Sequence, residues 1–222
     1  MTGPGQKICG LYLISDTAFS RGRTHEEIVR AGLSGGARVI QLREKKLSLH
    51  ELYPVALRIR EMTREADAAL IINDSIELAM AIGADGVHLG QEDMPAGVAR
   101  RLLGPDKIIG VSTHTIEEAL VAQGEGADYI GFGPIYKTDT KGSGEPKGPE
   151  GLRAIREKIK VPVVAIGGID AGNARVVIDA GADAVAVISA VVSAENIEKA
   201  AREIARVVTP HPNPSPARRG EL

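Results

Sequence analysis

The chain has 222 residues, enough for one large domain or two small ones, and its net charge of -2 gives no broad attraction to nucleic acid or anionic membranes. Hydrophobic residues make up 43% of the sequence and charged residues 25%, which is ordinary for a globular protein. Aromatic residues are only 3%, with no tryptophan, so the core must be aliphatic and base-stacking platforms for single-stranded nucleic acid are missing.

The cysteine content and the N-terminus indicate the compartment. The single cysteine, Cys9, has no internal disulfide partner, which fits a reducing environment. The opening MTGPGQK lacks an apolar signal core, and no apolar run approaches the roughly 20 residues of a membrane helix. We therefore expect a cytoplasmic protein that binds neither nucleic acid nor membrane.

Along the chain, a phrase built on Gly-Ala recurs and leads each time into an apolar run of strand length. The copies are GGARVIQLR (35–43), GADGVHLG (83–90), GADYIGFG (126–133) and GADAVAVIS (181–189). Each copy follows a segment with helical spacing, and glycine suits the end of a helix, where a left-handed backbone is needed. The repeat therefore predicts evenly spaced transitions from helix to strand.

Further strand candidates lie between these copies, at 11–15, 70–74, 108–113 and 162–168. Candidate strands thus alternate with helical segments, and several are apolar throughout, as strands buried on both faces are. The pattern predicts a single (β/α)8 TIM barrel over residues 1–208. An open doubly wound sheet is the alternative, but the even repeat favours closure. The proline-rich remainder, 209–222, is predicted to be a disordered tail.

Polar residues at the carboxyl ends of the predicted strands are candidates for ligand binding, because ligands bind there in such barrels. Gln41, Arg43 and Lys45 are spaced by two and share one side while the chain stays extended. Two cations on one side are costly unless an anion lies beside them, and a phosphate or diphosphate suits both. The alternative is that Arg43 and Lys45 point into solvent beyond the strand end.

Two aspartates follow the next strands along the chain. Asp74 and Asp93 could each be no more than a helix N-cap. Together, on adjacent loops beside the cations, they indicate a hard cation such as Mg²⁺, which prefers one or two carboxylates plus phosphate oxygens and water. His88 alternates with Val87 and Leu89, so we expect it to face the lumen as a hydrogen-bonded histidine.

The last strands of the predicted barrel end in small residues. Backbone N–H groups after strands seven and eight often hold a phosphate in these barrels. Gly167 and Gly168 allow close backbone approach, and Ile188 and Ser189 supply the second half of such a site. The Gly-Gly pair could equally be a plain turn.

Seven motifs at strand ends, in order, give the chain a resemblance to a known family. QLREK, IIND, GVHLGQED, GVSTH, GPIYKTDTK, AIGGI and VIS, spread over about residues 11–208, resemble thiamine phosphate synthase. The resemblance implies a transferase that joins a hydroxymethylpyrimidine diphosphate to a thiazole phosphate with Mg²⁺, giving thiamine phosphate and diphosphate. One departure from the family pattern is Lys137, where proline is common.

The resemblance also assigns roles residue by residue. It implies that the pyrimidine diphosphate is held by Gln41, Arg43, Lys45 and Asn73, and Mg²⁺ by Asp74 and Asp93. Ser112 and Lys141 would contact the diphosphate or the pyrimidine, and the thiazole phosphate would lie against Thr138, Thr140, Gly168, Ile188 and Ser189. The groups expected to act in catalysis are Arg43, Lys45, Ser112 and Lys141. The implied chemistry, in which diphosphate leaves before the thiazole nitrogen attacks, needs stabilisation of negative charge more than a strong base.

Two other functions stay open at this point. A thiazole tautomerase of the same fold would use a histidine, for which His114 is the candidate, and would lack much of the diphosphate site. A non-catalytic protein that binds a phosphorylated ligand is the second alternative. The expected partners are small-molecule substrates, and the sequence leaves the oligomeric state undetermined.

Overall fold

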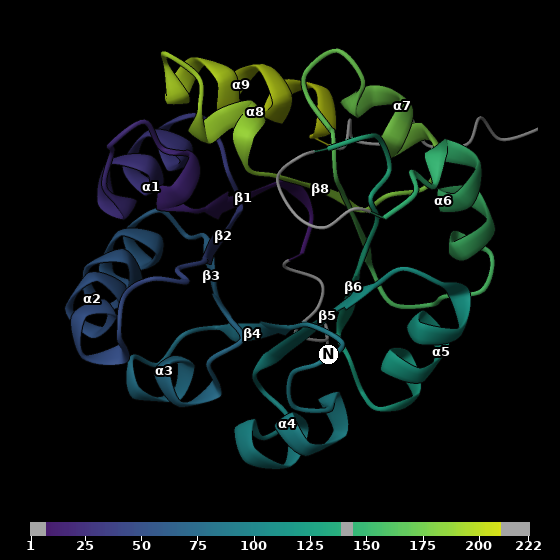
Figure 1. Cartoon of the computed structure of the whole chain (residues 1–222), viewed down its shortest axis with the longest axis horizontal. Coiled ribbons are helices and arrows are strands. Elements are labelled where there is room, and N and C mark those ends of the chain that lie inside the picture. The colour runs from purple at the N-terminus through teal and green to yellow at the C-terminus, as the bar shows by residue number, and fades with distance from the viewer. Residues whose placement is uncertain (1–7, 139–143, 210–222) are drawn as a thin grey trace, which may run out of the picture.

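The computed structural model describes residues 8–138 and 144–209, and in these ranges eight parallel strands close into a barrel (Figure 1). Each strand pairs with its neighbours in chain order, and the last pairs with the first. The strands are β1 Gly10–Ser15, β2 Val39–Leu42, β3 Ala69–Asn73, β4 Gly86–Leu89, β5 Ile108–Thr113, β6 Tyr129–Phe132, β7 Val163–Ile166 and β8 Ala184–Val187. The predicted TIM barrel is confirmed, and the open sheet is excluded.

Helices surround the ring of strands on its outside (Figure 1). They are α1 His25–Ser34, α2 Leu49–Glu65, α3 Ile76–Ala81, α4 Ala96–Leu103, α5 Ile116–Gly124, α6 Gly148–Arg156, α7 Ala174–Asp179, α8 Ser189–Val192 and α9 Ile197–Val208, with a short 3₁₀ turn, η2, at Thr17–Phe19. The last helix, α9, ends at Val208. Of the predicted tail, 209–222, only residue 209 is among the described residues, so the disorder of the tail stays a prediction.

The Gly-Ala repeat corresponds to one local structure used four times. The second glycine of the first copy and the glycine of each later copy have positive φ, at Gly36, Gly83, Gly126 and Gly181. In every copy the following alanine donates its N–H to a carbonyl five residues earlier, as Ala84 does to Ala79 at 2.9 Å. This is the Schellman pattern, which satisfies the last carbonyls of a helix and turns the chain into the next strand.

The aspartate that follows Gly-Ala in three copies ties neighbouring strands together at the amino end of the barrel. Asp128 accepts the backbone N–H of Ile109 at 2.8 Å and pairs with Arg100 of α4 at 2.5 Å. Asp85 binds Leu70 and Arg60, and Asp183 binds Val163 and Arg156, in the same way. We call these carboxylates the strand anchors. They lie opposite the predicted site, so their role is in holding the fold.

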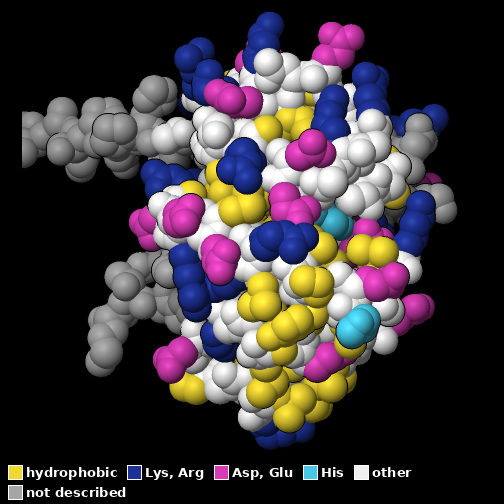
Figure 2. Space-filling view, turned by 90° about the vertical axis from the view of Figure 1, so that its left-hand side faces the viewer, with side chains coloured by type: hydrophobic (Ala, Val, Ile, Leu, Met, Phe, Trp, Pro, Cys, Tyr) yellow, Lys and Arg dark blue, Asp and Glu magenta, His cyan; other side chains and the backbone are white. Residues whose placement is uncertain are grey.

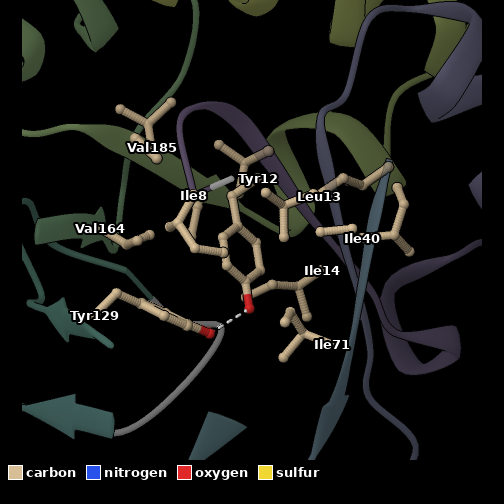
Figure 3. Close-up of a cluster of buried hydrophobic side chains, with 14 of the residues drawn as sticks. Ile8, Tyr12, Leu13, Ile14, Ile40, Ile71, Tyr129, Val164 and Val185 are labelled. Atoms are coloured by element: carbon tan, nitrogen blue, oxygen red, sulfur yellow. Dashed lines mark hydrogen bonds between the residues drawn. The ribbon is translucent and has the colours of Figure 1, made fainter. Parts of the chain in front are cut away.

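The interior of the barrel is aliphatic except for a few polar groups (Figure 3). Tyr12 of β1 and Tyr129 of β6 are fully buried side chains that point toward each other across the lumen, among isoleucine, leucine and valine. The pair register places Gly110 of β5 between His88 of β4 and Tyr129. A Cβ on Gly110 would lie 2.0 Å from Cζ of Tyr129, so only glycine leaves space for the ring.

The outer face over α1, α2 and α3 carries hydrophobic side chains among charged ones (Figure 2). On α2, Leu49, Tyr53 and Leu57 are exposed at a spacing of four residues, so they form one stripe. In the part of the chain that the structure describes, no helix is both long enough and apolar enough to span a bilayer.

Candidate active site

A cavity of about 510 Å³ opens at the carboxyl ends of the strands. Its lining includes every predicted site residue that the structure describes, drawn from β2 through β8 and their loops: Gln41, Arg43, Lys45, Asn73, Asp74, Asp93, Ser112, Thr138, Gly168, Ile188 and Ser189. The predicted residues Thr140 and Lys141 lie outside the described residues. Groups separated by up to 148 positions in the sequence therefore meet in one space of substrate size.

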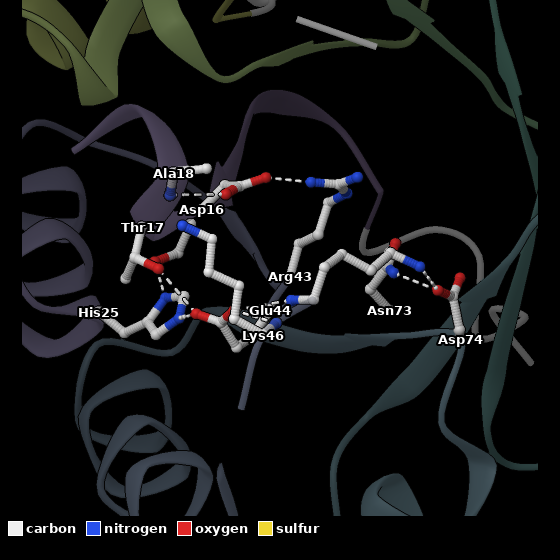
Figure 4. Close-up of polar contacts among 11 residues, drawn as sticks. Asp16, Thr17, Ala18, His25, Arg43, Glu44, Lys46, Asn73 and Asp74 are labelled. Carbon is white, nitrogen blue, oxygen red and sulfur yellow. Dashed lines mark hydrogen bonds and ion pairs between the residues drawn. The ribbon is translucent and has the colours of Figure 1, made fainter. Parts of the chain in front are cut away.

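One wall of this cavity is formed by Arg43 and Lys45, which we call the cationic edge. β2 ends at Leu42, so both residues lie beyond the strand, yet both line the cavity. Arg43 forms an ion pair with the buried Asp16, and the Lys45 ammonium donates to Asp74 Oδ2 at 2.5 Å (Figure 4). The alternative that the cations point into solvent is therefore wrong for Arg43, whose side chain is 16% exposed, whereas the Lys45 side chain is 56% exposed.

Asp74 and Asp93, the acidic pair, face the cationic edge. Asp74 has a φ of 62°, a left-handed conformation uncommon for a residue other than glycine. Burial raises the pKa of Asp93, and the carboxylate of Asp74 raises it further through a hydrogen bond and its charge, while the Gly90 N–H and Lys45 oppose the shift. The two carboxylates are thus close enough to repel each other.

Neither aspartate has the simpler role of a helix N-cap. The side chain that caps α3 is Ser75, which accepts the Leu78 N–H at 3.1 Å. The N-cap position of α4 is Pro95, which makes no side-chain capping bond, and Asp93 accepts the N–H of Gly90 at 2.6 Å instead. The N-cap interpretation of both carboxylates is therefore wrong.

A line of hydrogen bonds crosses the lumen beneath the charged groups, and we call it the lumen chain. Gln41 Nε2 donates to the Tyr12 hydroxyl at 2.8 Å, and the Tyr12 and Tyr129 hydroxyls are 2.8 Å apart. The Tyr129 hydroxyl lies 2.9 Å from His88 Nδ1, and His88 Nε2 lies 2.8 Å from Ser112 Oγ. His88 thus faces the lumen as the sequence predicts.

The two phenols of the lumen chain are uncharged at neutral pH. Burial raises the pKa of Tyr12, and hydrogen bonds from Tyr129 and Gln41 lower it by less. Burial also raises the pKa of Tyr129, with smaller contributions from Tyr12 and Asp128. Both phenols therefore stay protonated and present hydrogen-bonding groups in the lining of the cavity.

The opposite wall is built from residues after β6, β7 and β8, among them the small residues Gly168 and Ser189. Gly168 has a φ of 65°, and a Cβ there would lie 2.6 Å from the carbonyl oxygen of Lys137. This glycine therefore lets the β7 loop pack directly against the β6 loop that carries Thr138. Ile188 and Ser189 at the start of α8 complete the wall.

Sequence reasoning missed Tyr12 and Tyr129 as members of the site. Both line the cavity, and they join Gln41 to His88 in the lumen chain. A usable signal was present: the chain has only four tyrosines, and these two stand inside apolar strands where a hydroxyl needs a partner. His114, the tautomerase candidate, also lines the cavity but is about half exposed and pairs with Glu118 at 3.3 Å.

The fold and this cavity together define a (β/α)8-barrel protein with a cavity lined by cations and carboxylates at the carboxyl ends of its strands. The sequence profile of the family described as thiamine monophosphate synthase matches residues 11–191. The chain therefore belongs to that family of transferases in thiamine biosynthesis, and it is an enzyme.

Individual relatives agree with the profile. A thiamine-phosphate synthase of Moorella thermoacetica is 54% identical over 200 residues, covering 90% of this chain and 95% of the relative. One of Chloroflexus aurantiacus is 49% identical over 200 residues, covering 90% and 92%. The solved structure of a thiamine phosphate pyrophosphorylase from Pyrococcus furiosus superimposes with a TM-score of 0.83 at 44% identity, covering 91% of this chain and 96% of the other.

Proposed function

We propose that this cavity joins 4-amino-2-methyl-5-hydroxymethylpyrimidine diphosphate to 4-methyl-5-(2-hydroxyethyl)thiazole phosphate, giving thiamine phosphate and diphosphate. The observation that carries the proposal is the arrangement of groups within one cavity: a floor of hydrogen-bonding side chains, a cationic edge facing two carboxylates, and an opposite wall that includes Gly168 and Ser189. A heteroaromatic diphosphate needs the hydrogen-bonding floor and the cationic edge with its carboxylates. A second phosphorylated substrate needs the opposite wall.

The diphosphate of the first substrate is assigned to the cationic edge. Arg43 offers a planar fork of donors and Lys45 a mobile ammonium, and both line the cavity next to Asn73. The aminopyrimidine ring is assigned to the lumen chain below, where Gln41 and the two tyrosine hydroxyls can meet its ring nitrogens and amino group. Ser112 stands at the end of this chain, between ring and diphosphate.

The acidic pair fits Mg²⁺, because carboxylate oxygens are its preferred protein ligands and the mutual repulsion of Asp74 and Asp93 falls when a cation lies between them. Among the described residues, no group of three or more His, Cys, Asp or Glu side chains is placed to hold a metal. Asp74 and Asp93 would hold the ion, and diphosphate oxygens and water would supply its other ligands, as Mg²⁺ commonly accepts. Bound there, Mg²⁺ would neutralise charge on the leaving diphosphate.

The reaction follows from these assignments. The bond between the pyrimidine methylene carbon and the diphosphate oxygen breaks, and diphosphate leaves with the electron pair. Arg43 and Lys45 stabilise the charge that develops on the leaving group, and the buried lumen limits access of water to the cation on the pyrimidine methylene. The thiazole nitrogen then donates its lone pair to that carbon. The second substrate and the diphosphate are assigned to the opposite wall and the segment after β6. The residues proposed to hold them are Thr138, Thr140, Lys141, Gly168, Ile188 and Ser189.

A product assay with both precursors tests the proposal against its two alternatives. We expect thiamine phosphate to form when both precursors and Mg²⁺ are present. Conversion of the thiazole alone, without diphosphate release, would support a tautomerase that uses His114. Binding of either precursor without any product over a range of Mg²⁺ concentrations would support a non-catalytic binding protein.

A further inference from the structure

Behind the cationic edge lies a second set of polar groups that does not line the cavity. Glu44 stands between Arg43 and Lys45 in sequence, but its carboxylate points away from the cavity toward α1 (Figure 4). Its Oε1 accepts the backbone N–H groups of Lys45 and Lys46, each at 2.7 Å. Its Oε2 accepts the Thr17 hydroxyl at 2.7 Å and lies 3.2 Å from Nε2 of a histidine in α1. Oε1 of this carboxylate therefore holds the backbone of Lys45 and Lys46, while Oε2 connects it to side chains of η2 and α1.

That histidine is His25, whose side chain is 3% exposed, while that of Glu44 is 5% exposed. Burial raises the pKa of Glu44, but hydrogen bonds from Thr17, the Lys46 N–H, His25 and the Lys45 N–H together lower it to about 2. The ionised carboxylate can only accept, so His25 must present Nε2–H to it. The other ring nitrogen, Nδ1, lies 2.7 Å from Ser15 Oγ and links the network to the end of β1.

The order Ser15, His25, Glu44 resembles that of a nucleophile with its base and orienting acid. Ser15, however, is 0% exposed and does not line the cavity, so no substrate reaches its hydroxyl. The remaining role for the network is mechanical. It ties the segment 43–46, which follows β2, to the end of β1 and to the first turn of α1.

We propose that Glu44 and His25 are positioning residues for diphosphate binding: they fix the backbone of segment 43–46 in the turn that aims Arg43 and Lys45 into the cavity. This inference rests on the proposed function, in which these two cations bind the diphosphate. Long cationic side chains lose rotamer freedom when they bind a ligand, and a backbone already held in the required turn reduces that loss.

The test compares the two substrates in the full-length chain. In Glu44→Ala, we expect the KM for the pyrimidine diphosphate and the inhibition constant of inorganic diphosphate to rise at least about tenfold, the scale of one charge-assisted hydrogen bond lost. The KM for the thiazole phosphate should stay within about twofold, since its proposed contacts lie on the other wall. Damage to the fold alone would lower the active fraction of the enzyme and would not change the KM of one substrate more than that of the other.

Asp128→Ala is the matched control. Asp128 is likewise a carboxylate that accepts a backbone N–H and contacts a basic side chain, but it lies at the opposite end of the barrel. We expect this variant to unfold at lower denaturant concentration while all three constants stay within about twofold.

A second pair of variants keeps the test informative if Glu44→Ala fails to fold. His25→Leu should raise the same two constants, whereas His25→Gln should keep them within about threefold of the parent values, because its amide can still donate to Glu44.

Lys45→Ala distinguishes failure of the positioning role from failure of the proposed function. If Lys45→Ala leaves the KM for the pyrimidine diphosphate unchanged, the diphosphate assignment itself fails. If it raises that KM while the Glu44 and His25 variants do not, or if those variants raise both KM values alike, the positioning role is overturned.

Discussion

The hydroxyl of Tyr129 connects the two halves of the lumen chain, since it bonds to Tyr12 at 2.8 Å and to His88 at 2.9 Å. Tyr129→Phe keeps the ring that fills the space beside Gly110 but leaves its buried partners with one contact fewer. We expect kcat/KM for the pyrimidine diphosphate to fall about tenfold and the free energy of unfolding to fall by about 1–2 kcal/mol. Steady-state kinetics and urea unfolding measure both.

Tyr53→Phe, on the exposed stripe of α2, is the control for this change and should alter neither quantity measurably. A Tyr129→Phe enzyme with the kinetics of the parent would show that the lumen chain does not contact the substrate.

Asp93 carries the clearest prediction about the metal. In the proposed site, removal of this carboxylate would leave Asp74 as the one protein carboxylate on the cation, so Asp93→Ala should lower kcat by at least about 100-fold, the scale of a lost charge-stabilising group. The Mg²⁺ concentration for half-maximal rate should rise as well. Asp106→Ala, in the exposed turn before β5 at the far end of the barrel, should match the parent. Unchanged Mg²⁺ dependence in Asp93→Ala would remove this residue from the metal site.

The carboxylate of Glu44 predicts a pH dependence of stability. Its pKa is lowered in the folded state from the ordinary 4.5 to about 2, because the hydrogen bonds it accepts outweigh the effect of burial. A lowered pKa stabilises the fold above the unfolded value, and that contribution is lost as the pH falls through the folded value. The stability difference between the parent and Glu44→Gln should therefore shrink as the pH falls from about 4.5 toward 2. A difference independent of pH over this window would contradict the role of the ionised carboxylate.

Among the elements, the strand anchors should contribute to the free energy of unfolding according to how far each carboxylate is buried. The side chain of Asp128 is 16% exposed and that of Asp183 is 44% exposed, although both accept a backbone N–H from the preceding strand. We expect Asp128→Ala to cost about 1–3 kcal/mol of unfolding free energy and Asp183→Ala about half as much. Denaturant unfolding of the two variants measures this, and equal costs would show that burial does not set the contribution.

The elements were largely predictable because their signals are local. The Gly-Ala copies fix where helices end and strands begin, through backbone geometry that involves only neighbouring residues. Closure of the barrel followed from the spacing of those copies. The strand-end cations and carboxylates were found for the same reason, since a polar residue directly after an apolar run stands out in the sequence.

The lumen chain was only partly predictable because its bonds are not local. Tyr12 and Tyr129 are 117 positions apart, and alternation along a strand does not say which face turns to the lumen. The Glu44 network was missed for a related reason: a glutamate between an arginine and a lysine suggests a solvated turn, and only the fold reveals its buried partner in α1.

The whole molecule is a barrel whose two ends carry different sets of polar groups. The amino end carries the strand anchors, and the carboxyl end carries the cavity with its cationic edge, acidic pair and lumen chain. Such a division lets the loops of the site vary while the anchors keep the strands in register. We propose that the groups at the carboxyl end act together on two substrates.

The amounts of the two products, measured in the same reaction, test this joint action on both substrates. The full-length chain is incubated with both precursors, once with Mg²⁺ and once with a chelator in excess, and thiamine phosphate and diphosphate are quantified over time. We expect equal amounts of the two products with Mg²⁺, and a rate at least about 100-fold lower with the chelator. Diphosphate release without an equal amount of thiamine phosphate, or a rate indifferent to the chelator, would contradict this joint action.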